Sequence, residues 1–133
     1  MKTLRPYLLL LLLTTVLLSG CSEKTPEQQA IDTVIQSYEA LQRGDYETFL
    51  QGRAGMDSIP ADYREQLLTA YKQFAHQQCE AHGGINDFAV SRTETDTLNS
   101  VMQVFLLLNY ADSTREEIVV PMVQDSEGLW KMK

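Results

Sequence analysis

Basic residues are few in this 133-residue chain, and they never cluster. Eleven Lys and Arg stand against 18 Asp and Glu, which gives a net charge of −7. Nucleic-acid binding needs Lys and Arg gathered into a phosphate-binding patch, so this scatter argues against a nucleic-acid partner. The sequence also lacks a Gly-rich phosphate loop, a serine-nucleophile motif and paired metal-binding carboxylates. We therefore expect neither a cofactor nor a bound metal.

Cysteine is nearly absent, with Cys21 and Cys79 alone. Cys21 ends a signal-like segment, which leaves Cys79 without an intrachain disulfide partner. Cys79 falls on the apolar side of a predicted helix, where we expect a buried, inert thiol; a reactive thiol or an intermolecular disulfide is the alternative. His76, Cys79 and His82 are spaced three apart, but they spread over about 120° of a helix. With no fourth ligand evident, they do not predict a zinc site.

The longest hydrophobic run lies at the amino terminus and is too short to cross a membrane. Lys2 and Arg5 precede 12 apolar or neutral residues from Tyr7 to Leu18, whereas a spanning helix needs roughly 20. A positive start, a short apolar middle and small residues after it are the parts of a secretory signal. We predict that residues 1–20 are removed. The remaining 113 residues, with nine basic and 18 acidic side chains, suffice for one domain.

The run ends in Leu18-Ser19-Gly20-Cys21, which resembles the lipobox of bacterial lipoproteins. In that family the Cys thiol receives a diacylglyceryl group, the signal is cut before the Cys, and the new amine is acylated. The resemblance implies that Cys21 is lipidated, that residues 21–25 form a tether, and that the protein is anchored in the bacterial envelope. Ser22 replaces the Asp that often indicates inner-membrane retention, so the outer membrane is favoured, on its periplasmic side or at the cell surface. An ordinary signal cleaved nearby is the alternative.

Helical and strand patterns occupy separate parts of the remaining chain. A first helix begins at Pro26 and stops at Gly44, a short helix follows Asp45, and residues 52–58 form a loop. The other predicted elements are a helix from about 60 to 81 and strands over 85–95, 101–110, 116–123 and 129–132. Helices followed by an antiparallel meander predict an α+β domain, with three helices packed on a curved sheet of about four strands.

This arrangement resembles the nuclear transport factor 2-like superfamily, a cystatin-like cone of three helices and a curved antiparallel sheet. The matching residues are Leu41-Gln42-Arg43-Gly44-Asp45-Tyr46 and the closing Gly128-Leu129-Trp130-Lys131-Met132. More narrowly, the chain is similar to small bacterial lipoproteins of unknown function with a lumazine-binding-like domain. The resemblance covers most of residues 26–133, the predicted domain. Some superfamily members are isomerases or dehydratases that use Asp, His and Tyr in the cone's pocket.

The predicted second strand is apolar on both faces. One face carries Met102, Val104, Leu106, Leu108 and Tyr110, and the other carries Val101, Phe105 and Leu107. Such a strand is covered on both sides. The helices form one cover. A second subunit forms the other, giving a homodimer through the outer sheet face, unless the sheet bends enough for its own flank to shield the patch.

Candidate site residues are sparse. Asp87 is the one acid near an apolar strand segment and is a weak general-base candidate, equally readable as a solvated carboxylate. His76 and His82 fall on the solvent side and at the end of the third predicted helix. Four aromatic residues could line a ligand pocket or equally fill the core: Tyr38, Tyr71, Tyr110 and Trp130.

The sequence thus predicts a non-catalytic, lipid-anchored envelope domain that binds a small ligand or another envelope protein. The alternative is a small-molecule lyase or isomerase that uses Asp87 and a pocket tyrosine. A third reading is an accessory or immunity-type partner of a larger machine.

Overall fold

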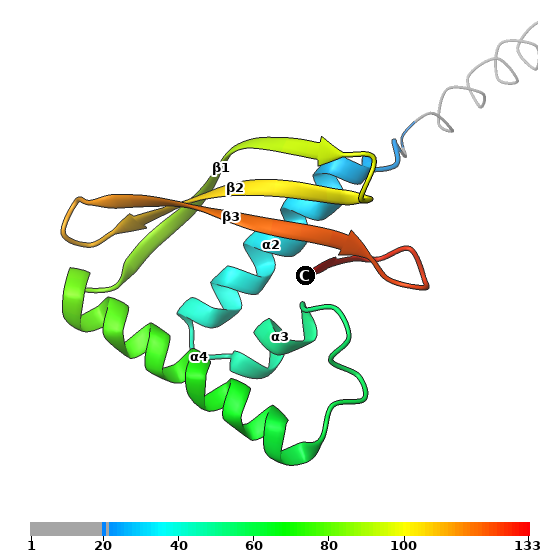
Figure 1. Ribbon diagram of the computed structural model, residues 1–133. Helices are drawn as coiled ribbons and strands as arrows, with labels where there is room; N and C mark the ends of the chain where they lie inside the picture. Colours follow the sequence, from blue (N-terminus) through cyan, green and yellow to red (C-terminus); the bar gives the residue numbers. More distant parts are fainter. Residues whose placement is uncertain (1–19, 21) are drawn as a thin grey trace, which may run out of the picture.

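The computed structural model describes residue 20 and residues 22–133, so the predicted signal and Cys21 lie outside the described residues. Three helices precede four strands, which confirms the predicted α+β class (Figure 1). The helices are α2 (Pro26–Gln42), α3 (Tyr46–Gln51) and α4 (Ala61–His82). The strands are β1 (Ile85–Asp96), β2 (Val101–Tyr110), β3 (Arg115–Gln124) and β4 (Trp130–Met132).

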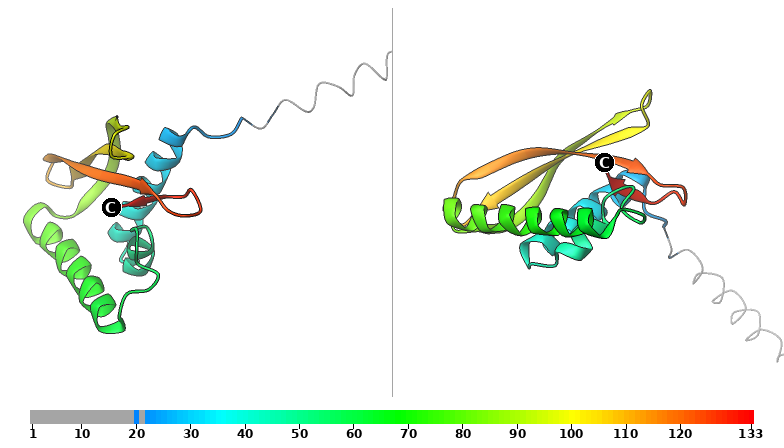
Figure 2. Two further views of the ribbon diagram at one scale, coloured as in Figure 1. Left: turned by 45° about the vertical axis from the view of Figure 1, so that its right-hand side comes forward. Right: turned by 60° about the horizontal axis from the view of Figure 1, so that its bottom comes forward.

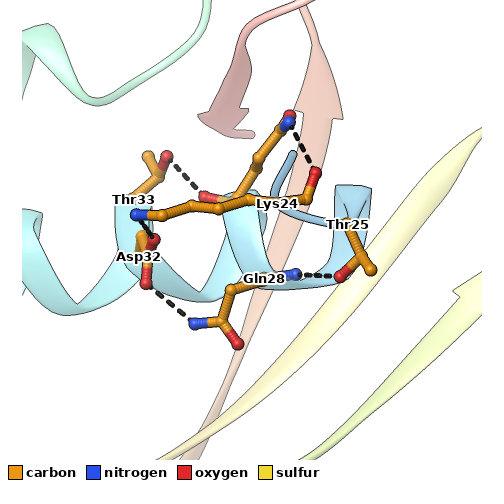
Figure 3. A network of polar contacts seen from close by, with 6 residues as sticks. Lys24, Thr25, Gln28, Asp32 and Thr33 are labelled. Carbon is orange, nitrogen blue, oxygen red and sulfur yellow. Dashed lines mark hydrogen bonds and ion pairs between the residues drawn. The ribbon is translucent and has the colours of Figure 1, made fainter. Parts of the chain in front are cut away.

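Polar side chains hold the segment before α2 against the helix (Figure 3). The Thr25 hydroxyl accepts a hydrogen bond from the Gln28 backbone N–H at 3.1 Å, and Pro26 occupies the first turn. The Lys24 ammonium lies 2.6 Å from Asp32, which also accepts from the Gln28 amide at 2.9 Å. The helix start predicted from the sequence is therefore stabilised by the residues that precede it.

The four strands pair in chain order as an antiparallel meander, and α2 crosses one face of the sheet (Figures 1 and 2). β1 carries two register irregularities against β2, which bend it and help curve the sheet. The core fills the space between α2, α3 and the inner sheet face. Its largest fully buried side chains are Leu50, Leu106, Leu108, Met122, Val34 and Val104.

The outer face of β2 is covered within the single chain at Phe105, whereas Val101 and Leu107 stay partly exposed. Phe105 is only 7% exposed, because the Arg92 guanidinium lies 3.6 Å from the centre of its ring. Arg92 also lies 3.8 Å from Glu117, which accepts a hydrogen bond from the Ser91 hydroxyl at 2.8 Å. Val119, which pairs with Phe105 across the strands, remains 48% exposed. The homodimer stays a prediction.

The long helix α4 has no buried residue. It ends at Gly83, whose left-handed conformation (φ 75°) lets its N–H reach the Cys79 and Gln78 carbonyls. The prediction of a buried Cys79 is wrong, because this side chain is exposed. Helical spacing placed it correctly on the inward-facing stripe, but that stripe lines an open pocket instead of a filled core.

Gly52 lies where α2, the end of α3 and β4 come close together. Its carbonyl accepts from the Met132 N–H at 2.8 Å, and the Met132 carbonyl accepts from Ala54 at 2.7 Å. A Cβ at Gly52 would overlap the Ser37 hydroxyl and would lie 3.2 Å from the Met132 Cε atom. The backbone angle is ordinary, so space, and not φ, requires glycine here.

We expect Gly52→Ala to lower the free energy of unfolding by about 1–3 kcal/mol, because the added methyl overpacks this junction. Urea unfolding of residues 22–133 measures this decrease in the free energy of unfolding.

The double variant Ser37→Ala, Gly52→Ala is the control, since removing the Ser37 hydroxyl makes room for the new methyl. Its loss should be smaller than the sum of the two single losses. Additive losses would contradict the proposed steric conflict.

Candidate functional site

A cavity of about 400 Å³ opens between the three helices and the middle of β3, and we call it the aromatic cavity. This volume falls within the range of small-molecule sites. Its walls are mostly apolar. The lining residues are Tyr38, Leu41, Phe49, Arg53, Tyr71, Phe74, Val119, Val120, Pro121, Met132 and Lys133.

Edge-to-face aromatic contacts hold the inner wall of this cavity in place. The Phe49 ring centre lies 5.3 Å from Tyr38 and 4.8 Å from Tyr71, with interplanar angles of 86° and 81°. Tyr38 also meets Phe88 of β1 at 5.9 Å. The helices α2, α3 and α4 thus each supply one ring of the wall, and Phe88, which does not line the cavity, supports it through Tyr38.

Arg53 is the polar centre of the aromatic cavity. It directly follows the Gly52 junction, and its Nη1 donates a 2.9 Å hydrogen bond to the Tyr71 hydroxyl. Arg43, Arg64 and Arg92 each pair with a carboxylate. Within residues 22–133, Arg53 has no carboxylate inside the 4.0 Å of an ion pair, although it is half-buried.

The Tyr38 hydroxyl is a second polar group of the cavity. Burial raises the pKa of Tyr38 to about 12, although the nearby charge of Arg53 opposes the rise. The phenol is therefore neutral at physiological pH and keeps a proton to donate. It has no hydrogen-bond partner among the side chains and backbone groups described.

Two of the other concavities lie near the helices and differ in character. A polar groove of about 540 Å³ runs beside the start of α2 and is lined by Lys24, Asp32, Trp130 and Lys131, among others. Its lysines already have partners, Asp32 for Lys24 and the Gln51 carbonyl for Lys131. A smaller pocket of about 310 Å³ shares Leu41 and Phe74 with the aromatic cavity and has no charged side chain in its lining.

The structure separates the four predicted pocket residues. Tyr38 and Tyr71 line the aromatic cavity, whereas Trp130 lines the polar groove. Tyr110 is buried, its ring stacks on His82 at 4.2 Å, and its hydroxyl donates to Glu116 at 2.7 Å. Burial, together with Glu116, raises the pKa of Tyr110.

Asp87 lies away from the aromatic cavity. It is exposed on β1, accepts a hydrogen bond from the Asn109 amide, and does not line the cavity. Among the cavity's lining residues there is no His, Asp or Glu. No three His, Cys, Asp or Glu of the described segment come close enough together to hold a metal ion.

Sequence reasoning missed Arg53. It lies in a predicted loop with no periodicity, so nothing indicated which way its side chain would turn. The available signal was local: a lone Arg between Gly52 and Ala54, three residues after the apolar Phe49-Leu50 pair, where a turn keeps the backbone next to the core.

A polar clamp joins the end of α4 to the turn between β2 and β3. His82 Nδ1 lies 2.9 Å from the Asp112 carboxylate, and the Asp112 N–H donates to the His82 carbonyl at 3.1 Å. Asp112 also accepts from the Thr114 N–H at 3.0 Å. Ser113 adopts the positive φ (69°) that this glycine-free turn requires. The clamp sets where α4, one wall of the cavity, meets the sheet.

Comparisons with known proteins show the fold. No protein-family model and no curated protein matches the chain. Among solved structures, a candidate NTF2-like transpeptidase from Campylobacter jejuni matches with a TM-score of 0.62 and 11% identity, over 82% of this chain and 97% of that one. The chain therefore has an α+β fold like the nuclear transport factor 2-like cone. No helix in the described part of the chain is long and apolar enough to cross a membrane.

The clamp predicts an acid-dependent stability. Hydrogen bonds from Thr114, then from His82, lower the pKa of Asp112 to about 2. A lowered carboxyl pKa stabilises the folded state fully above the unfolded value of about 4, and this contribution is lost as the pH falls through the folded value. We expect the free energy of unfolding to fall more between about pH 5 and about pH 2 in the wild type than in Asp112→Asn.

Urea unfolding at the two pH values measures how far the free energy of unfolding falls in the wild type and in Asp112→Asn. Asp57→Asn, in an exposed loop away from the clamp, should keep the wild-type fall. Equal falls in the wild type and Asp112→Asn would contradict the clamp.

Proposed function

We propose that this protein is a lipid-anchored lipoprotein of the bacterial envelope whose cone domain binds a small, mainly apolar ligand in the aromatic cavity without chemically changing it. The observation that carries the binding proposal is the cavity itself. Aromatic and aliphatic walls surround one half-buried, carboxylate-free Arg53. Apolar concavities with a few convergent polar groups are typical of ligand sites.

The anchor proposal rests on the Leu18-Ser19-Gly20-Cys21 sequence and on the position of the domain's first helix. α2 begins at Pro26, and a tether of five residues reaches at most about 20 Å. Lys24 is already held by Asp32, which shortens the free part. The folded domain should therefore sit close to a membrane surface, which we propose to be the outer membrane.

Binding is favoured over the lyase or isomerase alternative by the groups in the cavity. General acid–base catalysis needs a group that titrates near the working pH. The Tyr38 pKa of about 12 is far above that range, and Asp87 lies elsewhere. A second copy on the outer sheet face, or another envelope protein, remains part of the proposal as a partner.

Cys21→Ser should abolish lipidation, because the hydroxyl replaces the thiol that accepts the diacylglyceryl group. Incorporation of radiolabelled palmitate in a bacterial host, followed by mass spectrometry of the purified protein, measures the modification.

Cys79→Ser is the matched control, since it removes the other cysteine and should keep full incorporation. Palmitate incorporation that persists in Cys21→Ser would refute the anchor without touching the binding proposal.

The neutral fluorescent dye N-phenyl-1-naphthylamine should bind the described domain, and Phe74→Glu should weaken that binding at least tenfold because it places a carboxylate in the apolar wall. Fluorescence titration measures the affinity.

Tyr63→Glu makes the same kind of change on the same helix, at a residue that is 47% exposed and outside the cavity lining. It should bind the dye like the wild type. Absence of dye binding to the wild type, or equal losses in both variants, would count against a ligand site in the cavity.

A further inference from the structure

We infer that the ligand of the aromatic cavity is an amphiphilic monoanion: an apolar body with one carboxylate or similar anionic group that pairs with Arg53. This inference rests on the proposed function and names the class of ligand.

Arg53 has no carboxylate partner within residues 22–133. A charge that is taken out of water needs a counter-charge or several hydrogen bonds. Arg53 is half-buried against aromatic rings, yet the side-chain hydrogen bond that it makes within residues 22–133 goes to a hydroxyl, that of Tyr71, and not to a carboxylate. The planar guanidinium has five N–H groups, which leaves a fork free for a carboxylate.

The charge of the side chains that line the aromatic cavity also favours an anionic ligand. The chain has 18 acidic side chains and a net charge of −7, but no acidic side chain lines this cavity, whereas Arg53 does. A positive, low-dielectric concavity in an acidic protein concentrates anions locally and favours them over cations.

Two tyrosine hydroxyls of the aromatic cavity can donate hydrogen bonds to a ligand, as Arg53 can. Tyr71 accepts from Arg53, so its own hydroxyl proton is free, and Tyr38 keeps its proton and has no partner within residues 22–133. Two phenols and one guanidinium suit the two oxygens of a carboxylate. A phosphate dianion would be only half neutralised by Arg53, whereas a monoanion is matched, and the surrounding rings fit an apolar body.

Competition against bound N-phenyl-1-naphthylamine tests the charge preference with two ligands of the same shape. 2-Naphthoate carries the carboxylate, and 2-naphthamide is its neutral counterpart. We expect naphthoate to displace the dye at a concentration roughly tenfold or more below that needed for naphthamide, the usual gain from a charge-assisted hydrogen bond.

Arg53→Gln should remove this preference while the dye still binds. Arg64→Gln is the control: it deletes the same charge at a partly exposed arginine that is paired with Glu47 and does not line the cavity, and it should keep the preference. If Arg53→Gln does not fold, Tyr38→Phe replaces it. That variant keeps the ring and should weaken naphthoate more than naphthamide, because the bond from the hydroxyl to a carboxylate is the stronger one.

The outcomes separate the two proposals. Dye binding with equal competition by naphthoate and naphthamide overturns the anion inference and leaves the binding function standing. No dye binding by the wild type overturns both. A preference lost equally in Arg64→Gln reflects the net charge of the protein and also overturns the inference. A preference that Arg53→Gln alone removes supports it.

Discussion

The pairing of β4 with the Gly52 junction is the contact on which the rest of the structure depends. Two short backbone hydrogen bonds, Met132 to Gly52 and Ala54 to Met132, tie the last strand to the turn after α3. This closure brings Arg53 against the aromatic wall and places the start of α2 beside the end of the chain. Because glycine alone fits the space, a single small residue sets the position of the charged group in the cavity.

Arginine side chains have two different kinds of surroundings in this protein. Arg92, which is exposed, and Arg64, which is half-buried, are paired with carboxylates, and such pairs contribute little to stability. The cavity holds the opposite arrangement, an arginine with aromatic neighbours and no acid. An unpaired, half-buried charge is unfavourable for the free protein, which is consistent with the anionic ligand that we propose.

Local sequence signals predicted the fold well, because caps, periodicity and turns are short-range properties. Thr25 and Gly83 start and end helices as expected. Such local signals could not predict the cavity, because it arises where segments distant in the sequence leave space unfilled. Cys79 illustrates the limit, since periodicity identified its face but not the pocket beneath it. Arg53 lies in an aperiodic loop, and its neighbour Tyr71 is 18 residues away.

Because no side chain of α4 is buried, this helix is attached to the cone by contacts near the surface. Tyr71 and Phe74 of this helix pack against the core, and both are only partly buried. Polar contacts hold its two ends, His82 with Asp112 and Arg64 with Glu47. Because charged contacts near the surface are screened by salt, the attachment of this wall of the cavity weakens as the ionic strength rises.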